Sequence, residues 1–142
     1  MSKFLSILGC LLLATTFSCR TTQFIDQEGG WSFLGEEKVN HLRENDVFKI
    51  KSRDKFTALR VYVKEGDVEI RNVEVLLING DILKPVIEEK ILQGERSRLV
   101  ELGAEGRQLE QVRIWYRASG KMFSKKALVQ LGGRRYDSNK KF

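Results

Sequence analysis

Apolar and polar residues alternate along much of this chain, and this period of two constrains its fold more than any other feature. The alternation runs through residues 48–51, 59–64, 68–71 and 112–116. Such a pattern buries one face of a β-strand and leaves the other face in water. Many of the apolar positions carry β-branched residues, which suit a pleated surface. The pattern therefore predicts an all-β fold.

Turn-forming residues separate these runs at intervals of about ten residues. Asn79-Gly80-Asp81 is the strongest turn signal, and Glu65-Gly66-Asp67 is short enough to join the two strands of a hairpin. Gly132-Gly133 closes the last predicted strand, at residues 127–131. We predict roughly eight short strands in a single antiparallel β-sandwich, jelly-roll or immunoglobulin-like in architecture.

The N-terminus has the layout of a secretory signal, with a positive charge followed by a short apolar run. Lys3 supplies the charge, and the apolar stretch covers residues 4–17. Since a transmembrane helix needs about 20 apolar residues, a retained span is the weaker interpretation. Ser18 precedes Cys19 in a lipobox-like position, so we expect Cys19 to become the acylated first residue. Ordinary cleavage and an uncleaved anchor are the alternatives.

This signal sets the expected organisation of the chain. We predict a signal peptide at 1–18, a lipidated cysteine and flexible tether at 19–30, a β-sandwich domain at 31–136 and a basic tail at 137–142. The protein would then be lipid-anchored in the cell envelope. Arg20 after the cysteine is not an aspartate that retains some lipoproteins at the inner membrane, which favours the outer membrane, facing the periplasm or the surface.

Cysteine and histidine are too scarce to indicate a catalytic or metal centre. Cys10 lies in the signal and Cys19 is the proposed lipid site, so the domain has no thiol nucleophile and no disulfide. His41 is the one histidine, so a zinc site would need carboxylates for its other ligands and a Ser-His-Asp triad would have to use His41. We therefore expect no enzyme activity, no cofactor and no metal.

Positive charge is concentrated near the C-terminus. Residues 111–142 hold nine basic residues and one acidic residue, a net charge of +8, whereas residues 19–110 hold 15 basic and 18 acidic residues, a net charge of −3. This asymmetry indicates either an anionic partner surface or a solvated, solubilising end. Because the expected compartment is the envelope, we expect no nucleic-acid partner.

One predicted strand combines arginines with a tryptophan on a single face. Since two arginines should stay hydrated, that face is expected to meet water, where the indole could stack on a ligand while guanidinium groups bind anions. A second predicted strand carries a similar row, and the two would form one platform if the strands are neighbours. The alternative is that Trp115 packs under a loop, covered by the arginine stems. The two rows are Arg113, Trp115 and Arg117, and Arg60, Tyr62 and Lys64.

The second half of the chain resembles a known family. The matching segments are ILQG at 91–94, SRLVEL at 97–102, GRQL at 106–109, VRIWY at 112–116 and ALVQLG at 127–132. They resemble small exported bacterial β-sandwich proteins of the YaaI-like family, a family of unknown function. The resemblance implies an exported all-β sandwich and brings no catalytic residues. It implies structural roles for Gly94, Gly103, Gly106 and Arg107.

Together these features favour a binding or structural role over catalysis. We expect a lipid-anchored accessory protein of the cell envelope that contacts the membrane through acylated Cys19 and acts through protein–protein or structural contacts. The alternative is a binder of an anionic envelope glycan or lipid headgroup that uses the basic-aromatic rows.

Overall fold

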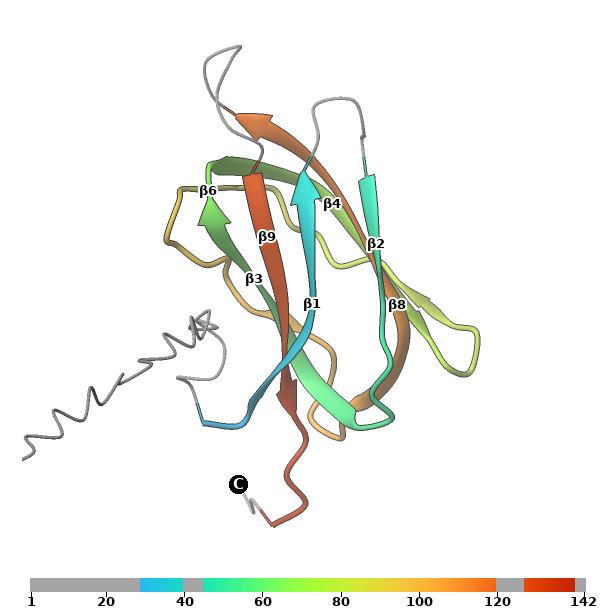
Figure 1. Cartoon of the computed structure of the whole chain (residues 1–142). Coiled ribbons are helices and arrows are strands. Elements are labelled where there is room, and N and C mark those ends of the chain that lie inside the picture. Colours follow the sequence, from blue (N-terminus) through green and yellow to red (C-terminus); the bar gives the residue numbers. More distant parts are fainter. Residues whose placement is uncertain (1–28, 40–44, 120–126, 140–142) are drawn as a thin grey trace, which may run out of the picture.

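The computed structural model describes residues 29–39, 45–119 and 127–139, and every regular element in these ranges is a β-strand (Figure 1). The all-β prediction is confirmed, with nine strands where roughly eight were expected. All of their pairings are antiparallel. The strands are β1 (Trp31–Val39), β2 (Asn45–Lys49), β3 (Lys55–Glu65), β4 (Asp67–Leu77), β5 (Ile82–Leu83), β6 (Glu89–Ile91), β7 (Val100–Glu101), β8 (Arg107–Ser119) and β9 (Ala127–Arg135).

The strands form one continuous hydrogen-bonded path that folds into two layers. The path runs β1-β9-β3-β8-β4-β5, with β2 beside β8, β6 beside β4 and β7 beside β3. β3 and β8 pair through Lys55 with Gln108 and Phe56 with Arg107, at the start of each strand. Beyond this corner they separate, so that β1, β9, β3 and β7 lie over β2, β8, β4, β5 and β6 (Figure 1). The result is the sandwich-like fold that the alternation predicted.

The core lies between the two layers and contains the apolar half of each alternating run. Val61 and Leu131 from one layer and Val75 and Ile114 from the other are at most 2% exposed. Each such side chain contributes about 1.5–3 kcal/mol through its removal from water. The inward faces of the long strands β3, β4, β8 and β9 therefore hold the two layers together.

The turn at Glu65-Gly66-Asp67 does not make the predicted hairpin. β3 ends at Glu65 and pairs with β9, whereas β4 begins at Asp67 and pairs with β8. Gly66, with φ 71°, carries the chain from one layer to the other, and its amide donates to Gln93 Oε1 at 3.0 Å. The hairpin prediction was wrong because both strands carry strongly apolar faces, which are buried best by facing each other across the core.

The prediction that Gly132-Gly133 ends the last strand is also wrong, because β9 continues to Arg135. A Cβ placed on Gly133 would lie 2.6 Å from Phe56 Cδ1 and 2.8 Å from Leu34 Cδ1. Both distances are shorter than the 3.4–4 Å of ordinary van der Waals contact. Gly133 is therefore a site of close packing within a strand, where glycine leaves room for two large neighbours.

Other glycines do form turns, as expected. Gly80 has φ 92° in the hairpin between β4 and β5, where Leu77 N–H donates to Asp81 O at 2.9 Å. Gly94, Gly103 and Gly106 also have positive φ, a conformation that glycine adopts without a steric penalty. Arg107 Nε donates to Leu102 O at 3.3 Å across the loop between β7 and β8. The structural roles implied for these residues agree with this geometry.

Candidate functional site

The first predicted row lies on β8, with the orientation that its alternation indicated. Val112, Ile114 and Tyr116 are buried, whereas Arg113 and Trp115 are half-buried on the opposite face. The side chain of Arg117 lies outside the described part of the structure. The outward face of β8 therefore presents an arginine beside a tryptophan.

Arg113 and Trp115 interact with each other on this face. The guanidinium carbon of Arg113 lies 5.7 Å from the centre of the Trp115 ring, which is within cation–π range. In the register of the sheet, Arg113 lies between Val47 on β2 and Glu74 on β4. Arg113 Nε is buried, and no hydrogen-bond partner for it is present among the described residues. The Arg113–Trp115 pair is thus formed without a ligand, and the Arg113 Nε has no hydrogen-bond partner among the described residues.

The second predicted row lies on β3, in the other layer. Arg60 and Lys64 are half-buried, and the guanidinium carbon of Arg60 lies 5.1 Å from the centre of the Trp31 ring. Tyr62 is only 4% exposed. Burial raises the pKa of Tyr62 above its ordinary value of 10.0, and the positive charge of Arg60 partly offsets this rise. The phenol of Tyr62 is therefore buried, whereas Arg60 and Lys64 on either side of it along β3 are half-buried.

The structure does not bring the two rows together into one platform. At Arg60 and Tyr62, β3 pairs with β9, whereas at Arg113 and Trp115, β8 pairs with β2 and β4. β3 and β8 meet only at their starts among the described pairs, and the rows lie beyond this corner on different layers. Each row is thus a separate surface.

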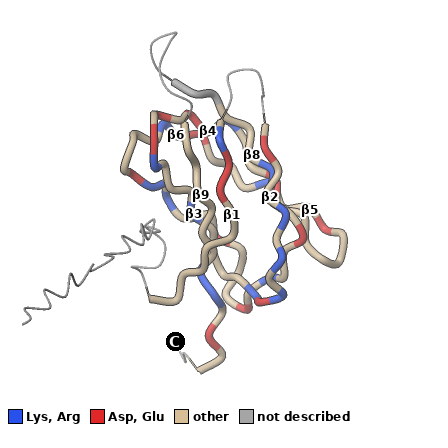
Figure 2. Tube along the Cα trace, in the orientation of Figure 1, with Lys and Arg blue, Asp and Glu red and all other residues tan. Residues whose placement is uncertain are grey.

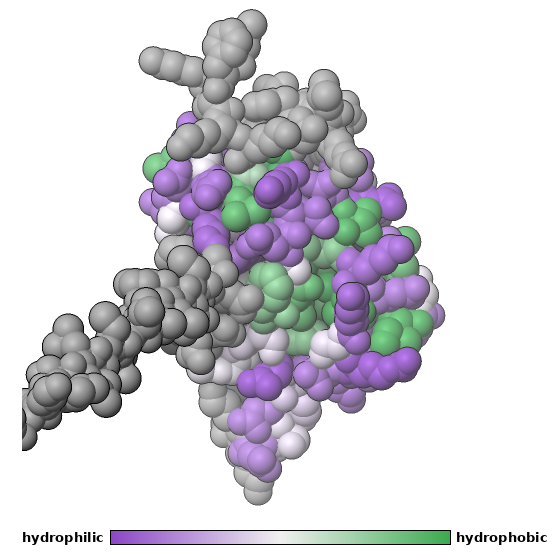
Figure 3. Space-filling view, in the orientation of Figure 1, coloured by the Kyte–Doolittle hydropathy of each residue, from purple (hydrophilic) through white to green (hydrophobic). Residues whose placement is uncertain are grey.

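A third surface lies along one open side of the sandwich, between β1 and β2. β1 pairs with β9 and β2 pairs with β8, so each is the edge strand of its layer among the described strands. Between them is a cavity of about 550 Å³ with apolar walls that include Phe33, Leu34, Val47 and Phe48. Apolar surface is visible here between hydrophilic margins (Figure 3). We call this cavity the edge groove.

The two sides of the edge groove carry opposite charges. Glu36 and Glu37 line it from β1, and Lys49 and Lys51 line it from β2 and the residues that follow (Figure 2). The strands approach closely at Gly35, where an added Cβ would lie 2.9 Å from Phe48 Cδ1. Sequence reasoning missed this site because the groove depends on which strands lie at the edges of the layers. The signal available was only local, an apolar cluster at residues 31–34.

A polar pair inside the sandwich was also missed. Asp46 lies in β2 and accepts a hydrogen bond from the hydroxyl of Tyr116 on β8. Both side chains are buried, with Asp46 5% exposed and Tyr116 4% exposed. A buried carboxylate requires such a partner because its desolvation is otherwise costly. Since Asp46 and Ile114 are paired in register, this contact connects the inner faces of β2 and β8.

A family model described as a domain of unknown function, DUF2541, matches residues 7–133. The chain belongs to this family. No curated protein and no solved structure showed significant similarity to it. A family without an assigned function agrees with what the resemblance implied, and membership of the particular YaaI-like type remains a prediction.

Two further predictions for this DUF2541 protein concern metal and membrane sites. In the described ranges, no three histidine, cysteine or acidic side chains gather where they could hold a metal ion. These ranges also contain no helix with the length and apolar character needed to cross a membrane. His41, Cys19 and the predicted signal at 1–18 lie outside the described residues. Two basic-aromatic pairs and the edge groove are thus among the candidate binding surfaces of the described residues.

Proposed function

We propose that this DUF2541 protein is a lipid-anchored accessory protein of the cell envelope that binds a protein partner in the edge groove. In this proposal, an acyl chain on Cys19 inserts into the outer membrane. The proposed activity is binding rather than catalysis. Eleven residues, 20–30, separate Cys19 from the start of β1 at Trp31. A fully extended segment of this length spans roughly 40 Å, so the tether would hold the domain close to the membrane surface.

The observation that carries the proposal is an apolar groove between two edge strands. An edge strand presents backbone donors and acceptors to which an additional strand can bind. A partner segment can add to a sheet edge through main-chain hydrogen bonds while its alternate side chains occupy pockets. We therefore infer that the occupant is an extended segment of a partner protein, with apolar residues at every second position.

Charge further defines this partner segment. Glu36 and Glu37 line one side of the groove, and Lys49 and Lys51 line the other. A segment with basic residues toward β1 and acidic residues toward β2 would complement both sides. Because the apolar walls supply the buried contact, association should persist at moderate salt, which mainly weakens exposed charge pairs.

The groove proposal can be tested by site-specific photocrosslinking of the full-length protein in its own cells. A photoreactive phenylalanine analogue replaces Phe33 in the groove, and Val86, at 91% exposed and outside the groove, is the matched control position. We expect a discrete adduct from position 33 that maps to an extended segment of one envelope protein. Val47→Glu should abolish this adduct, and moderate salt should not. Equal adducts from positions 33 and 86 would contradict the proposal.

The anchor is tested separately by incorporation of radiolabelled palmitate. Cells expressing the wild type should label the protein, and cells expressing Cys19→Ala should not. Cys10→Ala is the matched control, since Cys10 lies in the predicted signal and should leave the label unchanged. Absence of label from the wild type would remove the lipid anchor while leaving the groove proposal open to the crosslinking test.

A second candidate function uses the face that contains Arg113 and Trp115. The buried Nε of Arg113 has no hydrogen-bond partner among the described residues, which favours an anionic glycan or lipid headgroup as its ligand. Purified envelope polysaccharide and anionic vesicles should bind the wild type at low salt and less at high salt. Equal binding by Arg113→Ala/Trp115→Ala would exclude this function.

A further inference from the structure

A second cavity lies at the end of the sandwich where the chain enters and leaves the domain. Its volume is about 510 Å³, a size that suits a small ligand. Gly29 and Gly30 line it beside the end of β9, and Gly103 and Ala104 line it from the loop after β7. Arg135 N–H donates to Gly30 O at 2.8 Å, which joins the entering and leaving segments. We call this cavity the end pocket.

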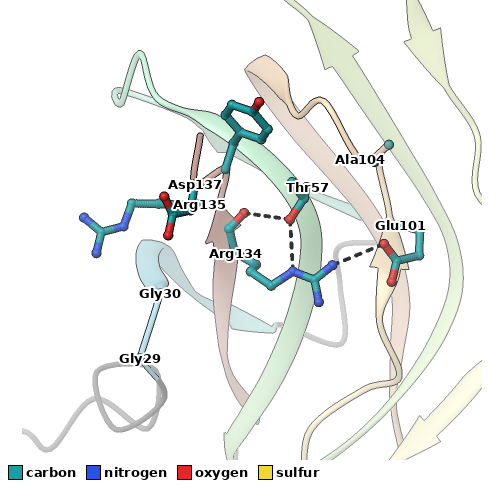
Figure 4. A pocket seen from close by; sticks show the side chains of 10 residues that line it. Gly29, Gly30, Thr57, Glu101, Ala104, Arg134, Arg135 and Asp137 are labelled. Atoms are coloured by element: carbon teal, nitrogen blue, oxygen red, sulfur yellow. Dashed lines mark hydrogen bonds and ion pairs between the residues drawn. The ribbon is translucent and has the colours of Figure 1, made fainter. Parts of the chain in front are cut away.

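Arg134 is held in a defined orientation in the end pocket (Figure 4). Its Nε donates to Thr57 Oγ1 at 2.9 Å, and its Nη2 lies 3.4 Å from Glu101 Oε2. The Thr57 hydroxyl donates to the carbonyl oxygen of Arg134 at 3.4 Å. Because the guanidinium plane is oriented in advance, a bound anion would cost it little further side-chain entropy.

Charges of both signs line the end pocket in equal number. Arg134 and Arg135 supply two positive charges, and Glu101 and Asp137 supply two negative charges. Arg134 points toward Thr57 and Glu101, whereas Arg135 points away from them (Figure 4). A simple anion would gain from the arginines but would be repelled by the carboxylates. A molecule that carries both charges matches this lining better.

Tyr136 adds an aromatic ring to the same pocket. An added Cβ on Gly106 would lie 2.9 Å from Tyr136 Cβ and 3.3 Å from its Cγ, so the base of this side chain rests against Gly106. An ammonium group over an aromatic ring gains cation–π attraction. The pocket therefore combines an oriented guanidinium with a carboxylate and a ring that suit an ammonium group.

We propose that the end pocket binds a small zwitterion that carries a phosphate or carboxylate group together with an ammonium group. Arg134 binds the anionic group, and Glu101 receives the ammonium group. Such a ligand has two sources, the headgroup of an ethanolamine phospholipid or a free amino acid. The site is separate from the edge groove and does not require the lipid anchor, although an anchor at Cys19 would favour the phospholipid.

The test is calorimetric titration of the full-length protein with four small molecules. Phosphoethanolamine and glycine carry both charges, inorganic phosphate carries only the anion, and ethanolamine carries only the cation. We expect saturable binding of at least one zwitterion, about tenfold or more tighter than either single-charge compound, as loss of a charged contact usually costs this much. Preference for phosphoethanolamine assigns a phosphate-bearing headgroup, and preference for glycine assigns an amino acid.

Variants of the pocket distinguish this site from nonspecific attraction. Arg134→Gln and Glu101→Gln should each weaken zwitterion binding about tenfold. Glu105→Gln is the matched control, because Glu105 is on the same loop and 75% exposed but does not line the pocket. Unfolding midpoints of all variants verify that they are folded, and Thr57→Val provides a milder change that leaves both charges in place. Equal affinity for inorganic phosphate, or unchanged binding by Glu101→Gln, would overturn the proposal.

Discussion

At the scale of single residues, Tyr62 links the fold to pH. Burial raises the pKa of its phenol above 10.0, so folding favours the neutral form. The preference of the folded state for a neutral phenol costs no stability below pH 10, where the phenol is neutral in both states. Stability is lost as the pH rises from the unfolded-state pKa through the folded-state pKa. We expect the free energy of unfolding to fall above pH 10, as measured by urea denaturation across a pH series. Tyr62→Phe should reduce this fall. An identical pH profile for the variant would contradict the prediction that ionisation of Tyr62 causes it.

Gly133 tests the close packing between β9 and the core. Gly133→Ala would place a Cβ 2.6 Å from Phe56 Cδ1, so the surrounding side chains must move. We expect a loss of about 1–3 kcal/mol in the free energy of unfolding, measured by urea denaturation. Gly29→Ala is the matched control, because no atom lies within 4 Å of its added Cβ. Equal stability of the two variants would show that the strand accommodates the methyl group.

The meaning of a glycine was predictable only where its neighbours in sequence decide it. In Asn79-Gly80-Asp81, the amide of Asp81 donates to Asn79 Oδ1 at 3.0 Å, so the turn is encoded within three residues. At Gly133, the reason for glycine is contact with Phe56 and Leu34, which are distant in sequence. The same residue type therefore marks a turn in one case and a strand interior in the other.

At the scale of elements, β8 is central to the layer that contains β2, β4, β5 and β6, because it pairs with both β2 and β4. Ile114 on its inner face is fully buried, and Ile114→Ala should lower the free energy of unfolding by about 2–5 kcal/mol. Ile82→Ala is the control, since Ile82 is 55% exposed and should change stability by less than about 1 kcal/mol. The two variants are compared by their thermal unfolding midpoints. Similar midpoints would show that the inner face of β8 does not contribute strongly to the stability of the core.

Strand positions were predictable because alternation is a local property, whereas strand partners were not. The run at 112–116 lies inside β8, and the runs at 59–64 and 68–71 lie inside β3 and β4. Their pairing depends on how all apolar faces are buried at once, and that requirement placed β3 and β4 in different layers. The same requirement separated Arg60 and Trp115, so a site that depends on neighbouring strands could not be derived from the rows alone.

At the scale of the whole molecule, the domain is stabilised by packing between its layers. Both cysteines, Cys10 and Cys19, precede β1, so no disulfide crosses the described domain. We therefore expect a reducing agent to leave the thermal unfolding midpoint unchanged, as measured by circular dichroism. A midpoint that falls on reduction would require a stabilising disulfide, such as one between two copies of the chain.

The sequence by itself determined the all-β class, most strand positions and the inward and outward faces of β8. These properties follow from residues that are adjacent or two positions apart, because a strand reverses its side-chain direction at each residue. Only the tertiary structure decided the layer of each strand, the edge groove and the end pocket. Each of these depends on contacts between residues far apart in sequence, such as Arg134 with Thr57 and Glu101, which form only when the core has closed.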